Sequence, residues 1–274
     1  MRKIPFTKMS GAGNDFILID AARLPRAASR PALARALCER RSSIGADGLL
    51  IVERRPRTGK GLPRVRYFNA DGSPAFCANG SRCAAWWMHK SRWVGRDLRF
   101  DSSEGPVQAL IAGAGRVRLR MPPARGPRRG LRLKAAGRTY RVEAINTGVP
   151  HAVVRVAPGR LDAFPVREVG RALRRHPVFR PGGTNVDFVS AHRGRCAIRT
   201  YERGVEDETL ACGTGAVAAA ILTAAAGVTK RAVRVVTRGG AVLTVRFATL
   251  PDGSFEDIWL EGPARAVYDG SVDL

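Results

Sequence analysis

Two cysteines, each followed within a few residues by glycine and then by a run of small residues, mark equivalent points in the two halves of this chain. Cys77 begins the stretch Cys-Ala-Asn-Gly-Ser-Arg-Cys-Ala-Ala, and Cys212 begins Cys-Gly-Thr-Gly-Ala-Val-Ala-Ala-Ala. They lie 135 positions apart in a chain of 274 residues, close to half its length. This spacing is far longer than a solenoid repeat, so the sequence predicts two similar domains rather than a repeat array.

The segments before the two cysteines support this duplication. Residues 65–73 and residues 197–207 each read as a strand-like run followed by a polar loop. A second similarity pairs residues 13–18, Gly-Asn-Asp-Phe-Ile-Leu, with residues 184–189, Thr-Asn-Val-Asp-Phe-Val. We therefore expect each half to contain a strand, a polar loop, a cysteine and a helix of small residues, in that order.

Short apolar runs between Gly and Pro turns indicate an α+β fold. The clearest strands are expected at residues 16–19, 48–52, 65–68, 117–121, 152–156, 186–190, 197–201, 233–237 and 241–247. Helices are expected at residues 31–41, 77–90, 166–175 and 212–225. The alanine-rich residues 216–225 predict a helix that is buried on all sides and wrapped by a sheet, because small side chains allow close packing. The turn-rich residues 122–127 are the best internal boundary.

Composition bounds the cellular context. Five cysteines form no disulfide-scaffold pattern, which is typical of a reducing compartment. The first residues lack the apolar stretch of a signal peptide, and no apolar tract is long enough to span a bilayer. We therefore expect a cytoplasmic protein without a membrane partner.

The net charge of +24 is large enough to suggest a nucleic-acid partner. However, the arginines are dispersed, and the clusters at residues 125–132 and 171–175 contain no aromatic side chains for base stacking. Dispersed charge of this kind attracts anions without specificity. We expect no specific nucleic acid, and a field that favours an anionic small substrate.

A cysteine at a helix start is suited to acid–base chemistry. Free backbone N–H groups and the positive end of the helix dipole stabilise the thiolate. If both helix starts point into one cleft between the domains, the N–H groups of Ala78, Asn79, Gly213 and Thr214 would hold one carboxylate. One thiolate could then remove an α-proton while the other thiol donates a proton from the opposite face. Such a reaction inverts a carbon centre and needs no cofactor and no metal.

Motifs spread along the whole chain resemble those of the diaminopimelate epimerase family. They are Lys-Met-Ser-Gly-Ala-Gly-Asn-Asp-Phe (8–16), Gly-Ala-Asp-Gly (45–48), Phe-Asn-Ala-Asp-Gly-Ser (68–73), Asn-Thr-Gly-Val-Pro-His (146–151), Thr-Asn-Val-Asp-Phe (184–188), Tyr-Glu-Arg-Gly (201–204) through Gly215, and the tail at 261–270. The resemblance implies two pseudo-symmetric domains, each a β-barrel-like sheet wrapped around a central helix, with the active site in the cleft between them. We place the domains at residues 1–120 plus 263–274 and at residues 121–262.

The resemblance also implies an activity and a set of site residues. The activity is the cofactor-independent interconversion of LL- and meso-2,6-diaminopimelate, in lysine and peptidoglycan precursor biosynthesis, by a homodimer. Cys77 and Cys212 are the expected acid–base thiols. His151 and Glu202 are expected to tune the thiol pKa values. The expected substrate-binding residues are Asn14, Asn69, Ala78, Asn79, Asn185, Glu202, Arg203, Gly213 and Thr214.

Three positions depart from the family pattern. Ala78 stands where the family usually has glycine. Alanine keeps the N–H donor but tolerates positive φ poorly, so we expect activity only if its backbone is helical. Val149 stands where the family often has asparagine, which removes one polar contact to the distal end of the substrate. Gly48 stands where some members have glutamine, so it offers no side chain.

Other functions remain open at this point. Proline-type racemases of the same architecture have histidine at the position of Asn79 and aspartate before the second cysteine, and this chain has neither. A histidine-type racemase shares more of the asparagine and Glu-Arg set. A different class is a basic nucleic-acid-binding protein on an inactive epimerase scaffold, against which the retention of both thiols argues. The remaining cysteines, Cys38, Cys83 and Cys196, are expected to be buried core residues.

Overall fold

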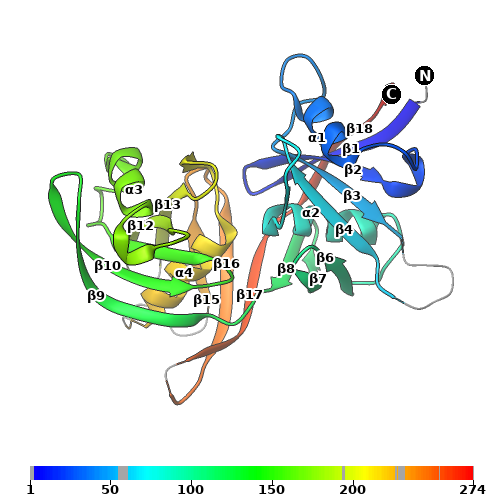
Figure 1. The fold of residues 1–274 in the computed structure, drawn as a ribbon. Coiled ribbons are helices and arrows are strands. Elements are labelled where there is room, and N and C mark those ends of the chain that lie inside the picture. Colours follow the sequence, from blue (N-terminus) through cyan, green and yellow to red (C-terminus); the bar gives the residue numbers. More distant parts are fainter. Residues whose placement is uncertain are drawn as a thin grey trace. The chain divides into compact units, whose positions relative to one another are not determined.

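A computed structural model describes residues 3–54, 61–192, 195–225, 227, 232–252 and 254–273. The chain divides into two compact units: Met1–Leu119 with Glu261–Leu274 form the first, and Arg120–Leu260 form the second. Figure 1 colours the chain from end to end and shows that each unit combines strands with a few helices. The α+β class predicted from the sequence is confirmed.

The first unit is built on a mixed sheet. Its strands are β1 (Lys3–Gly11), β2 (Asn14–Asp20), β3 (Gly48–Glu53), β4 (Arg64–Asn69), β5 (Pro74–Ala75), β6 (Asp97–Ser102), β7 (Gly105–Gly113), β8 (Arg116–Arg120) and β18 (Arg265–Asp273). Strand β1 is antiparallel to β18 and to β2, and β2 is parallel to β3. Strand β3 is antiparallel to β4. Strand β4 is also antiparallel to β5 and parallel to β6. Strands β6, β7 and β8 continue antiparallel.

The second unit repeats this pairing pattern. Its strands are β9 (Arg125–Ala135), β10 (Arg138–Asn146), β11 (Pro150–Arg155), β12 (Asn185–His192), β13 (Arg195–Glu202), β14 (Asp207–Thr209), β15 (Ala232–Val236), β16 (Val242–Thr249) and β17 (Phe255–Pro263). The pairs β10–β11, β12–β13, β13–β14 and β15–β16 are antiparallel, whereas β11–β12 and β13–β15 are parallel. Strands β10 to β16 therefore correspond in order and sense to β1 to β7.

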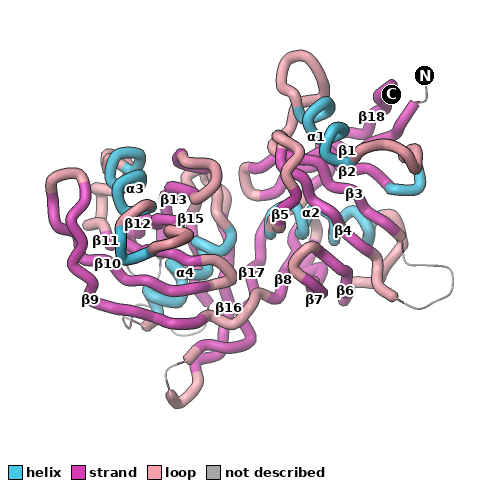
Figure 2. Tube along the Cα trace, in the orientation of Figure 1, coloured by secondary structure: helices cyan, strands magenta, loops and turns pink. Residues whose placement is uncertain are grey.

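A central helix fills the interior of each unit. Helix α2 (Ala78–Lys90) packs against β1, β2, β3, β4, β7 and β18, and α4 (Gly213–Ala224) packs against β10 to β13, β15 and β16. Figure 2 shows both helices among the strands of their own unit. Nearly all of α4 is buried, including the whole of residues 215–223. The predicted sheet-wrapped alanine helix is confirmed.

Two further helices cover the outer faces of the sheets. Helix α1 (Arg30–Cys38) packs on β3 and β4, and α3 (Val166–Arg174) packs on β12 and β13. Short 3-10 turns lie at Ala21–Arg23 and Pro177–Phe179. Because helices cover both faces of β3, its residues are buried without alternation, which explains its continuous apolar run.

The second similarity predicted from the sequence, between residues 13–18 and 184–189, is wrong as a structural equivalence. Asn14 begins β2, whose counterpart is β11, whereas Asn185 begins β12, whose counterpart is β3. Strands β2 and β12 both begin with an asparagine that is followed by an apolar run. The two segments look alike for this local reason.

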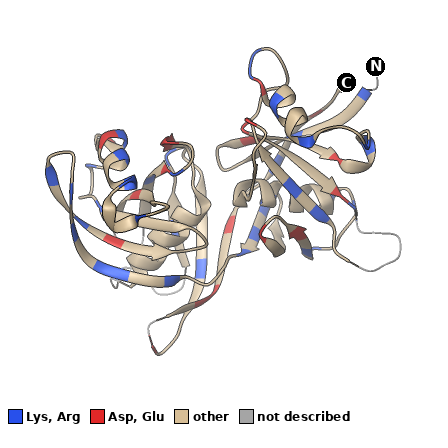
Figure 3. Cartoon of the chain, viewed as in Figure 1, with Lys and Arg blue, Asp and Glu red and all other residues tan. Residues whose placement is uncertain are grey.

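The basic side chains are spread over both units. Figure 3 shows Lys and Arg on many strands and loops. In β9 the arginine-containing residues 125–130 are all exposed. No helix among the described residues is long and apolar enough to cross a membrane.

Candidate active site

Cys77 is the N-cap of α2. Its backbone is extended, with φ −133°, and its Sγ accepts a hydrogen bond of 3.4 Å from the N–H of Gly80. Cys77 is half-buried, and Ala78 is the first residue of the helix. Ala78 is not among the residues with positive φ. Ala78 therefore has the helical backbone that an alanine tolerates at this position.

The amide of Asn79 is held at both ends. Its Nδ2 donates a hydrogen bond of 2.7 Å to Oδ1 of Asn14, and its Oδ1 accepts a hydrogen bond from Arg82. Asn14 in turn donates to Asp47 over 2.9 Å. Two of the predicted substrate-binding residues are thus brought together beside Cys77.

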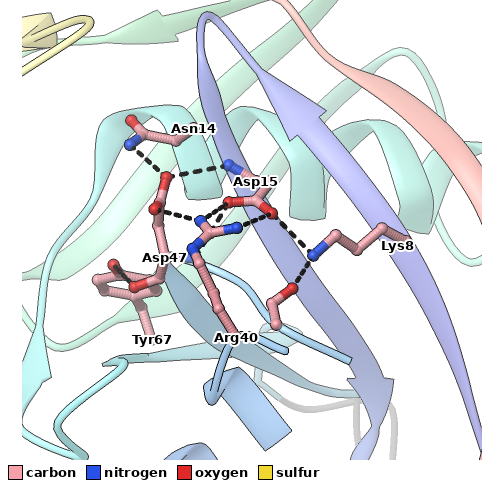
Figure 4. Close-up of polar contacts among 7 residues, drawn as sticks. Lys8, Asn14, Asp15, Arg40, Asp47 and Tyr67 are labelled. Atoms are coloured by element: carbon pink, nitrogen blue, oxygen red, sulfur yellow. Dashed lines mark hydrogen bonds and ion pairs between the residues drawn. The ribbon is translucent and has the colours of Figure 1, made fainter. Parts of the chain in front are cut away.

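Figure 4 shows how this chain of contacts continues into an ion-pair cluster. Arg40 lies 2.7 Å from Asp15 and 2.8 Å from Asp47, and Lys8 lies 2.8 Å from Asp15. Lys8 also donates to the carbonyl of Gly45. Burial alone would raise the pKa of Asp15, but the hydrogen bonds from Arg40 and Lys8 outweigh it and lower the pKa to about 2. The cluster fixes the β1–β2 turn that carries Asn14.

Asn69 is not part of this chain of contacts. It ends β4, opposite Gly48 of β3, and its Nδ2 donates to Oγ of Ser73 over 3.0 Å. The loop that follows is closed by Asp71, whose carboxylate accepts from the N–H and the hydroxyl of Ser73. Asn69 therefore lies in the turn that leads to Cys77.

Cys212 is the N-cap of α4 in the second unit. Its Sγ accepts a hydrogen bond of 3.4 Å from the N–H of Gly215 and lies 3.4 Å from Oγ1 of Thr214. The Thr214 carbonyl accepts from the hydroxyl of Thr147, 2.9 Å away, which fixes the first turn of α4 against the loop after β10. Gly213 is the first helical residue and is buried.

A chain of hydrogen bonds leads away from Cys212 into the core. Thr214 Oγ1 lies 2.9 Å from Nε2 of His151, and Nδ1 of His151 lies 2.7 Å from Oδ2 of Asp187. The other carboxylate oxygen of Asp187 accepts a hydrogen bond of 2.8 Å from Thr200. The side chains of His151 and Asp187 are completely buried.

Glu202 is a second carboxylate, besides Asp187, that acts on Cys212. Its Oε2 accepts a hydrogen bond of 2.9 Å from Thr209. Burial raises the pKa of Glu202, although the Thr209 hydrogen bond opposes the rise. Burial, together with the carboxylates of Glu202 and Asp187, raises the pKa of the Cys212 thiol well above its ordinary value. The resting form of Cys212 is therefore the thiol.

Asn185 and Arg203 form a separate pair in the second unit. Asn185 Oδ1 accepts from the backbone N–H of Arg203 over 2.8 Å, and Asn185 Nδ2 donates to the carbonyl of Pro150 over 3.2 Å. In the described part of the chain, no hydrogen bond or ion pair is found for the guanidinium of Arg203. This side chain is suited to a carboxylate from outside the protein.

The structure also identifies side chains that the sequence analysis did not single out. They are Arg82, Asp47 and Arg40 in the first unit, and Asp187 and Thr200 in the second. The sequence contains a signal for Asp187, because this acidic residue stands inside the apolar run of β12. In the structure Asp187 is 0 % exposed. A carboxylate at such a position requires a partner.

The other cysteines are structural. Cys38, Cys83 and Cys196 are buried with exposures of 2 %, 0 % and 1 %. Burial raises their pKa values to about 11, 12 and 11 respectively. The prediction that they are core residues is confirmed. Within the described ranges no group of three or more His, Cys, Asp or Glu side chains could hold a metal ion.

Comparison with solved structures shows the same fold. A phenazine biosynthesis protein of the PhzF family from Bacillus anthracis matches with a TM-score of 0.74 at 14 % identity, covering 100 % of both chains. A hydroxyproline epimerase from Agrobacterium vitis matches with a TM-score of 0.69 at 15 % identity, covering 99 % of this chain and 92 % of that one. At these identities the likeness concerns the fold alone.

Comparison with curated sequences goes further. The diaminopimelate epimerase of Chlorobaculum tepidum is 42 % identical over 97 % of this chain and 100 % of its own length. That of Hydrogenobaculum sp. is 38 % identical over 97 % of both chains. The sequence profile described as diaminopimelate epimerase matches residues 6–125 and 143–249. With both cysteine helices inside the matched ranges, the chain belongs to the diaminopimelate epimerase family.

Proposed function

We propose that this chain is an epimerase that interconverts LL- and meso-2,6-diaminopimelate without a cofactor. The observation that carries the proposal is that Cys77 and Cys212 both cap the central helix of their unit, in a chain 42 % identical to a named diaminopimelate epimerase. The product serves lysine and peptidoglycan precursor synthesis.

In the proposed reaction, one cysteine removes the α-proton as a thiolate and the other returns a proton as a thiol. The N–H groups of Ala78, Asn79, Gly213 and Thr214 bind the α-carboxylate, onto which the negative charge of the carbanion spreads. Preorganised N–H donors of this kind stabilise developing charge because they need no reorientation during the reaction. The raised pKa of Cys212 suits it to the acid role in the direction of the reaction in which the Cys77 thiolate removes the α-proton. The roles exchange in the reverse direction.

The remaining predicted residues would recognise the two ends of the substrate. Asn14, Asn69 and Asn185 supply amide donors and acceptors. Glu202 accepts from an ammonium group, and the guanidinium of Arg203 forks onto a carboxylate. We also propose that the enzyme acts as a cytoplasmic homodimer, which light scattering of the purified protein tests.

The decisive experiment follows α-proton exchange and inversion in deuterated water with LL-diaminopimelate, proline and histidine as separate substrates. We expect turnover of diaminopimelate alone. Cys77→Ala and Cys212→Ala should each abolish inversion, and the serine variants should keep a trace of it because a hydroxyl is a much poorer base. Full activity in either alanine variant would refute the two-thiol reaction, and turnover of histidine alone would assign the chain to a different racemase class.

Mild oxidation gives an independent test of the same reaction. This test applies if closure of the site brings the two sulfurs within disulfide distance. We expect loss of activity together with a Cys77–Cys212 peptide in mass spectrometry, both reversed by dithiothreitol. Inactive enzyme with both thiols free would contradict this.

A further inference from the structure

The two cysteine sites have the same backbone frame but different side chains behind them. In the first unit β2 pairs in parallel with β3, and Phe16 lies opposite Gly48. In the second unit β11 pairs in parallel with β12, and His151 lies opposite Asn185. His151 therefore occupies the position of Phe16.

The next residues along the two strands differ as well. A Cβ added to Gly80, three residues after Cys77, would meet Leu50 at 3.1 Å and Phe16 at 3.4 Å. A Cβ added to Gly215, three residues after Cys212, would meet the carboxylate of Asp187 at 2.5 Å. Asp187 therefore occupies the position of Leu50. The apolar pair Phe16 and Leu50 lies behind the first cysteine, and the polar pair His151 and Asp187 lies behind the second.

One placement of the protons gives the hydrogen bonds of this polar pair a consistent direction. The Asp187 carboxylate accepts only, so it takes the Thr200 hydroxyl proton on Oδ1 and the Nδ1–H of His151 on Oδ2. In the tautomer that carries its proton on Nδ1 alone, His151 has a lone pair at Nε2 that accepts the Thr214 hydroxyl proton. The Thr214 oxygen is left to accept the S–H of Cys212. Every donor points from the sulfur toward the carboxylate.

We propose that Asp187 and Thr214 form, with His151, a proton relay that ionises Cys212 and that Cys77 lacks. The Cys212 proton passes to the Thr214 oxygen while the Thr214 hydroxyl proton passes to Nε2 of His151. The products are a thiolate and an imidazolium held against the Asp187 carboxylate, so charge and protons balance within the relay. Asp187 is a positioning residue, because it acts on the sulfur only through His151 and Thr214. This inference rests on the proposed function for its role in turnover.

The charges around Cys212 make the relay distinguishable from a simple field effect. The carboxylates of Glu202 and Asp187 act on Cys212 through their charge, and the charge of Asp187 also acts on the buried thiol of Cys196. The direct field of Asp187 raises the pKa of Cys212. If Asp187 acted on Cys212 only through its electric field, removal of its charge would make Cys212 more reactive. If Asp187 acts through the relay, removal of its charge makes Cys212 less reactive, because the imidazolium of His151 loses its counterion.

The test measures alkylation of each cysteine by iodoacetamide between pH 6 and 9, with peptides quantified by mass spectrometry and no substrate present. We expect Asp187→Asn and Thr214→Val to slow alkylation of Cys212 at pH 7 by about tenfold, the loss of one charge-assisted hydrogen bond. The rate should recover at high pH, and Thr214→Ser should restore it at pH 7. Cys77 should react as in the wild type throughout.

Two controls separate the relay from structural damage. Thr147→Val removes a hydrogen bond to the carbonyl of Thr214 but leaves the Thr214 hydroxyl in place, and should leave Cys212 alkylation unchanged. Labelling of the buried Cys38, Cys83 and Cys196 would show that a variant is misfolded. If Asp187→Asn is misfolded, the comparison of Thr214→Val with Thr214→Ser tests the relay.

Faster alkylation of Cys212 in Asp187→Asn, or equal rates in the valine and serine variants, would overturn the proposal. The labelling experiment needs no substrate, so it tests the relay independently of the epimerase activity. Labelling can contradict the relay while the alanine variants of the two cysteines support the epimerase reaction, or support the relay while those variants contradict the reaction.

Discussion

Asn79 in the first turn of α2 donates a hydrogen bond of 2.7 Å to Asn14 at the start of β2. The same amide accepts from Arg82, so its orientation is set by protein groups on both sides. Arg82 is 0 % exposed, and its Nε and Nη1 have no hydrogen-bond partner among the described residues. Burial lowers the pKa of Arg82 to about 10. A buried cation with unpaired donors weakens the fold, and its contact with Asn79 indicates a role in the site.

Arg82→Met should therefore separate stability from activity. Removing the unpaired donors should leave the free energy of unfolding unchanged or raise it by about 1 kcal/mol. Loss of the anchor on Asn79 should lower kcat/KM by about tenfold, the effect of losing one charge-assisted hydrogen bond. Urea unfolding and the epimerase assay measure the two quantities. Arg99→Met, at an exposed position of β6, is the control, and equal kcat/KM in both variants would contradict the assigned role.

The Asp15 cluster predicts a loss of stability in acid. The folded-state pKa of Asp15 is about 2, below its ordinary 3.8, so the carboxylate stabilises the fold at neutral pH. This contribution is complete above pH 4 and disappears as the pH falls toward 2. Because Asp15 is partly exposed to solvent, we expect about 1 kcal/mol rather than the full value of the shift.

The variant Asp15→Asn tests this linkage. It should be about 1 kcal/mol less stable than the wild type at pH 6, and the difference should vanish near pH 2. Chemical unfolding at both pH values measures it, with the exposed Asp97→Asn as the control. A difference that does not change with pH would exclude the ion pairs as its cause.

The helices could be predicted from the sequence because their starts are local. Ser29, Cys77 and Cys212 each accept a hydrogen bond from the first turn, and the four observed helices begin within one residue of the predicted positions. Strand β9 could not be predicted in this way. Its first residues are exposed and arginine-rich, and its hairpin with β10 turns through Ala136 and Gly137, both with positive φ, rather than through a recognisable Asn-Gly pair.

The proposed relay could not be predicted from the sequence, for a different reason. His151 and Asp187 lie 36 positions apart, and only the parallel pairing of β11 with β12 brings them together. The sequence shows a histidine in a motif and an acidic residue in an apolar run, but not that they are partners. The false equivalence between residues 13–18 and residues 184–189 had the same origin, since strand order within a sheet is not encoded in any single segment.

Glu202 predicts the opposite pH dependence to Asp15. Its folded-state pKa is raised because it is buried, so the folded protein binds a proton that the unfolded chain has released. Stability is therefore lost as the pH rises above the ordinary value of 4.5. Glu202→Gln should be more stable than the wild type at pH 8, by a margin that shrinks toward pH 4, while epimerase activity falls because the ammonium acceptor is gone. Urea unfolding at the two pH values checks the sign, and a margin that grows toward acid would refute it.

The two glycines behind the cysteines give a matched pair of variants. In Gly215→Ala the new methyl group would overlap the Asp187 carboxylate, which His151 and Thr200 hold in place, so the relay has to shift. In Gly80→Ala the methyl group would meet the flexible end of Leu50 at 3.1 Å, the edge of Phe16 at 3.4 Å and Cβ of Cys77 at 3.6 Å. We expect Gly215→Ala to cost about 1–3 kcal/mol of unfolding free energy, as other overpacked cores do, and Gly80→Ala less than about 1 kcal/mol. Activity should fall more in Gly215→Ala, and alkylation should slow at Cys212 but not at Cys77. Equal losses in the two variants would mean that the polar pair His151 and Asp187 behind Cys212 is no more rigid than the apolar pair behind Cys77.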